Sequence, residues 1–212
     1  MSDANAYVGA YPFLQARRAV WREIVRYALR DLAFEPEDVV ELAAGYGDFI
    51  NQVPAKRRLA FDLNPEMASF ADDEVEWHVD DANQISILGA QSVDWVFASN
   101  FFEHLDLDAG SELLESIGRV LRPGGCLTLL QPNHRRCAAH YFDDPTHVTI
   151  FDDQNIREWL EGHGLRVRRL IPGLLPFSMK SRLPKSPLLV RAFLNSPIRP
   201  GGAQMYVVAE RI

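Results

Sequence analysis

The sequence contains little cysteine and no long apolar run. Its 212 residues include two cysteines, Cys126 and Cys137, which have no CxxC spacing. Two such cysteines provide neither a disulfide framework nor a zinc site of their own, so a reducing compartment is expected. No apolar run reaches the length of about 18 residues that a membrane span needs, and no basic stretch followed by an apolar one opens the chain. The sequence therefore predicts no spanning helix, no signal peptide and a cytoplasmic location.

Basic residues are scarce in most of the chain. The net charge is −7, but residues 1–165 carry 13 basic and 28 acidic side chains, whereas residues 166–212 carry 9 basic and 1 acidic. An acidic body argues against a general nucleic-acid-binding function, because phosphate contacts need a positive surface. The length and the ordinary composition predict one globular domain over residues 1–212.

Segments with strand and helix patterns alternate along the chain. Strands are predicted at 39–42, 58–62, 75–79, 92–99, 126–131, 165–171 and 204–210. Helices are predicted at 13–33, after the glycine turn (49–53), from Asn64-Pro65, at 111–121 before Pro123-Gly124-Gly125, and at 154–163. This alternation is typical of an α/β doubly wound, Rossmann-like fold with a largely parallel sheet.

Polar residues follow the predicted strands at their carboxyl ends, where open α/β sheets bind ligands. The ends of the first five strands carry Glu41 with Ala43-Ala44-Gly45-Tyr46-Gly47, then Asp62, Asp80-Asp81, Asn100 and Gln131-Pro132-Asn133. Carboxylates and amides suit the recognition of hydroxyls and amines. No Lys-Ser/Thr follows the glycine turn, which excludes a P-loop, and Ile50 stands where a dinucleotide site has its third glycine. The turn by itself still leaves a nicotinamide-dependent reductase open.

Five segments together resemble, in order and spacing, the motifs of class I S-adenosylmethionine-dependent methyltransferases. They cover about residues 36–131 and read VVELAAGYGD (39–48), AFDLNP (60–65), DA (81–82), SNFFEHL (99–105) and RVLRPGG (119–125). The resemblance implies a seven-stranded sheet with an antiparallel last strand, S-adenosylmethionine as cofactor, and methyl transfer as the reaction. Ala43 departs from the family pattern, which usually has glycine there, while Gly45 and Gly47 stay in register.

The resemblance also implies which residues bind the cofactor. It puts the methionine moiety against the loop from Glu41 to Gly47, Asp62 on both ribose hydroxyls and Leu63 on the adenine face. The implied cofactor-binding residues are Glu41, Ala43, Gly45, Gly47, Asp62, Leu63, Asp81, Ala82 and Asn100, of which Asp81 and Ala82 contact the adenine edge and Asn100 lies below the methyl donor. Without the surrounding motifs, helix capping or a solvated turn would explain Asp62 and Asp81 equally well.

Two histidines are candidate catalytic residues, because a hydroxyl acceptor must lose its proton during methyl transfer. His104 follows the fourth strand, and His147 lies in the loop after the fifth. The alternatives are a packing role for His104 and a loop-stapling or capping role for His147. A divalent-metal site built from His140, Asp143, Asp144 and His147 is a further alternative. Because that cluster is carried by a loop and its acids are adjacent, no metal site is predicted.

Three segments are expected to wall the acceptor pocket: the helix 13–33, the loop 134–150 and the basic apolar excursion 171–202. The excursion suits a lid, a dimer patch or peripheral contact with an anionic membrane. Together with YFDDPTHV (141–148), it resembles small bacterial methyltransferases of glycan and surface-polysaccharide assembly. That looser resemblance implies O-methylation of a sugar or lipid-linked saccharide. A non-catalytic S-adenosylmethionine-binding protein and a methyltransferase for another small molecule are the alternatives, and the sequence leaves the oligomeric state open.

Overall fold

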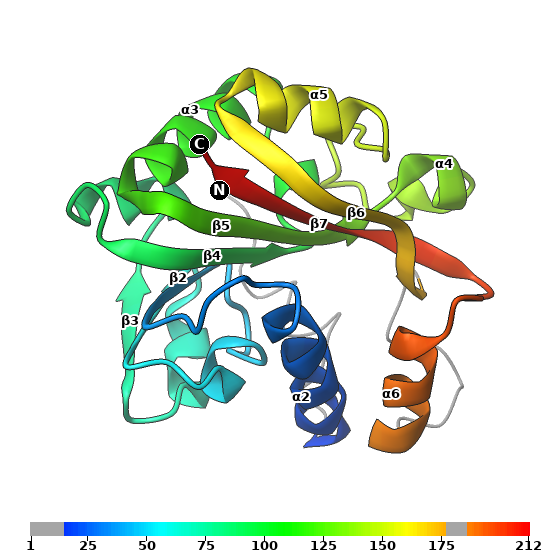
Figure 1. Ribbon diagram of the computed structural model, residues 1–212, viewed down its shortest axis with the longest axis horizontal. Coiled ribbons are helices and arrows are strands. Elements are labelled where there is room, and N and C mark those ends of the chain that lie inside the picture. Colours follow the sequence, from blue (N-terminus) through cyan, green and yellow to red (C-terminus); the bar gives the residue numbers. More distant parts are fainter. Residues whose placement is uncertain (1–14, 177–185) are drawn as a thin grey trace.

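The computed structural model describes residues 15–176 and 186–212. A seven-stranded sheet with the order β3-β2-β1-β4-β5-β7-β6 forms its centre (Figure 1). The strands are β1 Asp38–Leu42, β2 Arg57–Asp62, β3 Val75–Val79, β4 Val93–Ser99, β5 Leu121–Pro132, β6 Leu165–Pro176 and β7 Gly202–Arg211. The first five strands are parallel, and β7 runs antiparallel to both β5 and β6. The predicted α/β sheet with its antiparallel last strand is confirmed.

Helices cover both faces of the sheet. The α-helices are α2 Gln15–Leu29, α3 Leu107–Val120, α4 His134–Cys137, α5 Asn155–Gly162 and α6 Pro187–Asn195. Five 3-10 helices, η1 Ile50–Gln52, η2 Pro65–Phe70, η3 Ala82–Ile87, η4 Phe102–His104 and η5 Tyr141–Asp143, lie in the connections. In Figure 1, α3 and α5 lie above the sheet, while α2 and α6 lie below it. Each face thus has its own layer of packing.

The alternation of side chains along the strands builds two separate cores. Val40 and Leu42 of β1 pack with Leu113, Ile117 and other residues of α3 on one face. On the other face, Val39 packs with residues of α2, η1 and α6. A strand buried on both faces needs apolar residues at successive positions, which is the pattern at Val39-Val40 in β1 and at residues 95–98 in β4. This burial fixes the sheet and therefore the positions of the loops at its carboxyl edge.

Several predicted boundaries differ from the structure. The first long helix ends at Leu29 rather than at residue 33, and its predicted residues 13 and 14 lie outside the described part of the chain. The helix predicted at 111–121 begins at Leu107, because the Asp106 side chain accepts a hydrogen bond from Ala109 N at 2.8 Å and caps it. The segments after Asp48 and Asn64 form short 3-10 helices. Asn64 caps its helix as predicted, accepting from Glu66 N at 3.0 Å.

The chain after residue 120 also departs from the prediction. The α3 helix ends at Val120, Leu121 takes an extended conformation, and Pro123-Gly124-Gly125 lie within β5 instead of forming a turn between the helix and a strand that starts at Cys126. The excursion predicted at 171–202 begins later than expected, since residues 171–176 belong to β6, and α6 lies within it. No helix in the described residues is long and apolar enough to cross a membrane.

Candidate functional site

The loop after β1 turns sharply at the carboxyl edge of the sheet. Ala43, Gly45 and Gly47 have φ angles of 50°, 54° and 62°, in the left-handed region that favours glycine. Ala43 therefore has a glycine-type backbone conformation, although it carries a Cβ. The loop closes onto β2, because Gly45 N donates to Asp62 Oδ2 at 2.7 Å.

Two buried acidic side chains hold this loop from within. Glu41 accepts a hydrogen bond from Ile50 N at 2.9 Å, and burial raises the pKa of its carboxyl group well above the usual range. Asp48 pairs with Arg17 Nε of α2 at 2.8 Å. The sequence suggested that Glu41 borders the cofactor; in the structure its described hydrogen bond supports the turn into η1.

The end of β2 presents a carboxylate beside an exposed apolar side chain. Asp62 Oδ2 accepts from Gly45 N, and Asp62 Oδ1 accepts from Asn64 N at 2.8 Å. Burial raises the pKa of Asp62, although these two hydrogen bonds lower it. The neighbouring Leu63 side chain is 61% exposed. A carboxylate oxygen accepts two hydrogen bonds, so each Asp62 oxygen keeps the capacity for one more.

The ends of β3 and β4 complete the predicted cofactor edge. Asp81 is exposed and caps η3 by accepting from Asn83 N at 2.8 Å, while Ala82 is buried. Asn100, with φ 49°, follows β4, and its Oδ1 accepts from Gln204 Nε2 at 2.8 Å. Because β1 lies between β2 and β4, the segments after these strands emerge along one edge of the sheet.

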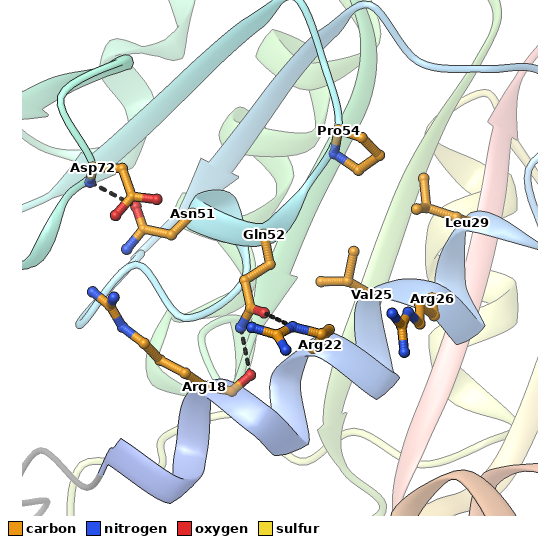
Figure 2. Close-up of a pocket in the computed structure, with 9 residues that line it drawn as sticks. All are labelled: Arg18, Arg22, Val25, Arg26, Leu29, Asn51, Gln52, Pro54 and Asp72. Carbon is orange, nitrogen blue, oxygen red and sulfur yellow. Dashed lines mark hydrogen bonds between the residues drawn. The ribbon is translucent and has the colours of Figure 1, made fainter. Parts of the chain in front are cut away.

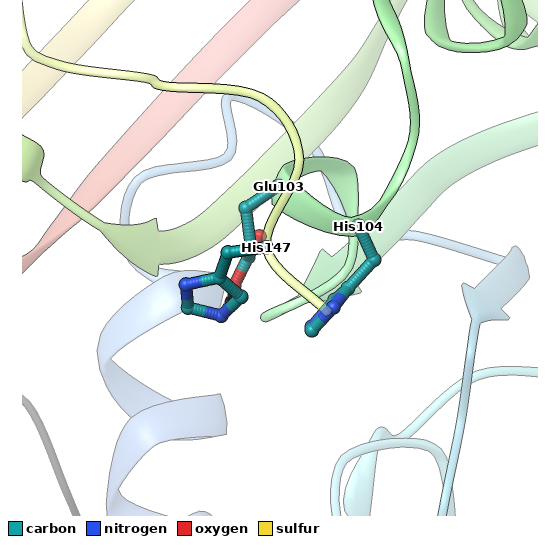
Figure 3. A group of neighbouring side chains, drawn as sticks. All are labelled: Glu103, His104 and His147. Carbon is teal, nitrogen blue, oxygen red and sulfur yellow. Dashed lines mark ion pairs between the residues drawn. The ribbon is translucent and has the colours of Figure 1, made fainter. Parts of the chain in front are cut away.

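His104 and His147, distant in sequence, lie together (Figure 3). Their ring centroids are 4.8 Å apart. Glu103 lies beside both histidines. Each of the three side chains offers one potential metal-ligand atom, and these three atoms lie within 4.8 Å of one another. Glu103 and His104 belong to η4, whereas His147 lies in the loop before α5. Val148 N and Thr149 N donate to Glu103 O at 2.9 and 3.1 Å, which ties this loop to η4.

The hydrogen-bond partners of the two histidines define which ring nitrogen carries the proton. His147 Nδ1 contacts the Tyr141 carbonyl oxygen at 2.5 Å, and a carbonyl only accepts, so Nδ1 donates. Thr146 Oγ1 donates to Asp144 at 2.5 Å and therefore accepts from His104 Nδ1 at 2.8 Å. Burial lowers the pKa of His104, and the neighbouring His147 lowers it further. In the neutral rings, Nε2 consequently carries the lone pair.

Glu103 is fully buried, and neither of its carboxylate oxygens has a hydrogen-bond partner in the described part of the chain. His147 Nε2 lies 4.0 Å from Glu103 Oε1. Burial raises the pKa of Glu103 to about 8, and the nearby Asp144 adds to this effect. Glu103 was not among the predicted site residues, although an acidic residue within the apolar segment FFEHL (101–105) is a signal for it.

The other residues considered for a metal site are engaged elsewhere. His140 Nδ1 pairs with Asp143 Oδ2 at 3.0 Å, and both side chains are exposed. Asp144 accepts from Thr146 N at 3.0 Å. The structure therefore groups His147 with Glu103 and His104 rather than with His140 and Asp143.

A surface pocket of about 420 Å³ lies on the α2 side of the sheet (Figure 2). Arg18, Arg22 and Arg26 of α2 line it opposite Asn51 and Gln52, and Arg22 Nε donates to Gln52 Oε1 at 3.3 Å. None of the predicted cofactor-binding or catalytic residues borders this pocket. It adjoins the glycine loop through Asn51, whose N donates to Gly47 O at 3.1 Å.

Comparison with known proteins agrees with the arrangement of this edge. Residues 39–125, which run from β1 into β5, match a family model described as "Methyltransferase domain". This match indicates a methyltransferase domain and covers less than half of the chain. The match supports an enzyme that transfers methyl groups. No curated protein matches the sequence.

Solved structures share the fold of this methyltransferase over nearly its whole length. A methyltransferase of Haloferax volcanii, solved in complex with the Trm112 methyltransferase activator, has a TM-score of 0.72 at 18% identity, covering 99% of this chain and 98% of that one. An S-adenosylmethionine-dependent methyltransferase of Archaeoglobus fulgidus has a TM-score of 0.71 at 20% identity, covering 99% and 100%. One from Thermotoga maritima has a TM-score of 0.70 at 17% identity, covering 98% and 97%. At these identities, the likeness establishes the fold.

Proposed function

We propose that this methyltransferase acts as one domain over residues 1–212 and methylates a hydroxyl group of a small-molecule or glycan acceptor, specifically a sugar or lipid-linked saccharide. The observation that carries the proposal is the meeting of His104 and His147 directly after β4, with Nδ1 of each ring committed to a hydrogen-bond acceptor. A hydroxyl acceptor requires removal of its proton, and two neutral imidazoles offer that function.

The cofactor site proposed here consists of the residues that the sequence motifs indicated. They are Glu41, Ala43, Gly45, Gly47, Asp62, Leu63, Asp81, Ala82 and Asn100. Asp62 fits this role because each of its oxygens has one backbone donor and room for a ribose hydroxyl. The exposed Leu63 offers an apolar surface to an adenine ring. Glu41 acts by holding the loop through Ile50 N.

Methyl transfer from a sulfonium depends mainly on alignment of the reacting atoms. When bound, S-adenosylmethionine supplies the methyl group: an acceptor oxygen forms the new C–O bond, the C–S bond breaks with its electrons left on sulfur, and the hydroxyl proton passes to a base. The residues of this chain orient the two partners and accept that proton. His104 and His147 are proposed to activate the acceptor, because His104 follows Asn100 by four residues after β4 and the His147 ring packs against the His104 ring at 4.8 Å.

Acceptor recognition is proposed for the loop 134–150, α2 and the segment 171–202. Part of that segment lies outside the described residues, including Phe177, Met179, Lys180, Arg182, Leu183 and Lys185. In the described part, Leu188 and Leu189 on α6 are exposed, which supports contact with a lipid-linked acceptor or a membrane surface. Arg191 is instead bound to Glu23 of α2 at 2.7 Å.

The acceptor class is tested by labelled methyl transfer. Cell extracts separated into glycolipid, soluble-sugar, protein and small-amine fractions are incubated with deuteromethyl S-adenosylmethionine, and mass spectrometry locates the label. We expect O-methyl label in the sugar or glycolipid fraction. The His104→Ala and His147→Ala variants should incorporate at least about tenfold less label than the wild type, whereas the remote variant His163→Ala should incorporate as much as the wild type. Label confined to nitrogen, sulfur or carbon atoms contradicts O-methylation.

Membrane contact has its own test. Co-sedimentation with anionic phosphatidylserine vesicles is compared for the wild type, a Lys180/Arg182/Lys185→Ala variant and a Leu188→Ser/Leu189→Ser variant. Binding that falls in both variants and at high salt supports the proposal. Equal sedimentation of all three proteins argues for a lid or an interface between protein chains.

A further inference from the structure

We propose that Glu103, His104 and His147 form a binding site for one divalent transition-metal ion at the acceptor side of the methyltransferase. The catalytic use of this ion rests on the proposed O-methylation, whereas its binding does not. The three side chains have ligand atoms within 4.8 Å of one another and come from two separate segments of the chain (Figure 3). Two imidazoles and one carboxylate are a recurrent ligand set for such ions.

The hydrogen bonds around the histidines have the pattern found around metal ligands. A ligating histidine commonly donates its other ring N–H to a carbonyl or a carboxylate, which fixes the tautomer and the ring. His147 Nδ1 donates to the Tyr141 carbonyl, and His104 Nδ1 donates to Thr146 Oγ1, which in turn donates to Asp144. The Nε2 lone pair of each ring is therefore available to bind a cation.

Glu103 gives a second, independent reason to expect a cation. Its carboxylate is fully buried and has no side-chain hydrogen-bond partner in the described chain; only the nearby backbone N–H groups of Glu103 and Phe101 lower its pKa, without forming hydrogen bonds of ordinary geometry. An unpaired buried carboxylate is costly, and its nearest nitrogen, His147 Nε2 at 4.0 Å, carries a lone pair when Nδ1 holds the proton. Two lone-pair nitrogens and a carboxylate have no donor among them, so a bound cation satisfies all three groups together.

The surrounding backbone holds the three ligands in place. The amides of residues 148 and 149 bond to the Glu103 carbonyl at 2.9 and 3.1 Å, so the loop with His147 is fixed to η4. Ligand atoms about 2.0–2.2 Å from one ion lie roughly 3 Å apart, so binding requires the side chains to close by about 1–2 Å. Three protein ligands leave open positions for an acceptor oxygen, whose proton a divalent cation makes easier to lose to solvent; with the ion bound, the two histidines act as ligands and take the base role only in the metal-free site.

The chemistry of the ligands identifies the class of ion. Imidazole nitrogens suit Fe²⁺, Co²⁺ and Zn²⁺, and Mn²⁺ accepts a carboxylate together with imidazole, whereas Mg²⁺ and Ca²⁺ prefer sites built from oxygen atoms alone. We therefore expect Co²⁺ and Mn²⁺ to bind in preference to Mg²⁺. A shared proton between Glu103 and His147 is the competing explanation for the unpaired carboxylate, and it requires no metal.

Metal binding is measured on the full chain after removal of bound metals with a chelator and dialysis. Co²⁺ is titrated with visible absorption as the readout, and Mn²⁺ with electron paramagnetic resonance, in the absence of acceptor. We expect one equivalent to bind, with affinity reduced at least about tenfold in His104→Ala and in His147→Ala. His140→Ala is the matched control, because this histidine lies in the same loop but outside the cluster, and its variant should bind as the wild type does.

The outcomes separate this proposal from the proposed function. No saturable Co²⁺ or Mn²⁺ binding by the wild type, or equal binding in the His104→Ala variant, overturns the metal site and favours the shared proton. S-Adenosylhomocysteine affinity and the thermal midpoint, measured on each variant, show whether it is folded. If His147→Ala or Glu103→Gln unfolds, metal binding by the His104→Ala variant still tests the site, because His104 is partly exposed and its removal is expected to leave the protein folded. Failure of O-methylation with metal bound would contradict the acceptor assignment alone.

Discussion

Asp62 Oδ2 accepts the backbone N–H of Gly45 at 2.7 Å, which fastens the glycine loop after β1 to the end of β2. The second oxygen of the same carboxylate accepts Asn64 N at 2.8 Å. One side chain thus shapes the loop on one side and the start of η2 on the other. The residue proposed to hold the ribose is therefore also a structural tie, and its removal should affect both affinity and stability.

The Asp62→Ala variant should bind S-adenosylhomocysteine at least about tenfold more weakly, because charge-assisted hydrogen bonds contribute about 1.5–3 kcal/mol each. Isothermal titration calorimetry measures the loss. Asp73→Ala, which removes an exposed acid of the same charge near β3, is the control and should retain the wild-type affinity. Unchanged affinity in the Asp62→Ala protein would refute the assigned ribose contact.

The raised pKa of Asp62 predicts how cofactor affinity depends on pH. Burial favours the protonated carboxyl, so its pKa lies above that of an ordinary aspartate. Only the carboxylate accepts hydrogen bonds at both oxygens, and affinity should be full above this raised pKa and fall as the pH drops through it. Dissociation constants for S-adenosylhomocysteine between about pH 4 and 8 test this. The same acid midpoint in Asp62→Asn would assign the decline to another group.

The strands and the cofactor loop were predictable because their signals are local. A buried parallel strand needs apolar residues at successive positions, and the turn that follows needs glycine at positive φ. The Glu103–His104–His147 cluster was not predictable as a group, since His147 lies 43 positions after His104 and only the η4 contact brings them together. Similarly, the start of α3 depends on the Asp106 cap, while its apolar stripe begins only at Leu113.

Ala43→Gly should stabilise the protein or leave its stability unchanged. A φ of 50° is strained for alanine by roughly 1–2 kcal/mol, and glycine removes this strain at an entropic cost of about 0.4–1 kcal/mol. Thermal unfolding measures the net effect. Ala44→Gly is the matched control: Ala44 is buried and has no positive φ, so that variant should lose at least about 0.4–1 kcal/mol through the greater freedom of the unfolded chain. A lower midpoint for the Ala43 variant would contradict the strain argument.

Two glycines near the end of α3 should respond to alanine in opposite directions. A Cβ on Gly125 would lie 2.9 Å from Arg122 O and 3.0 Å from Asp94 O, so Gly125→Ala must shift the backbone and destabilise the fold. A Cβ on Gly118, inside α3, meets nothing within 4 Å. Gly118→Ala should therefore stabilise the protein by up to about 1 kcal/mol. Chemical denaturation distinguishes them, and equal effects would show that the RPGG segment has no steric requirement for glycine.

The Glu23–Arg191 pair should control the attachment of α6 to α2. Arg191 donates from Nε and Nη2 to the two oxygens of the buried Glu23, at 2.7 and 2.9 Å. Arg191→Ala leaves this carboxylate with Arg26 alone and should lower the thermal midpoint. Arg30→Ala, which removes the exposed hydrogen bond from the residue just after α2 to Asn195 Oδ1 of α6, is the control and should cost less.

Acid should remove the difference between the wild type and Arg191→Ala. The hydrogen bond from Arg191 holds the pKa of Glu23 below its usual range, so the pair contributes stability above about pH 4.5 and loses it as the pH falls through the lowered pKa. Thermal midpoints measured from pH 7 to pH 3 should therefore converge for the two proteins. Midpoints that stay equally far apart at pH 3 would mean that Arg191 acts by packing on α2 rather than by its charge, because packing does not titrate with Glu23.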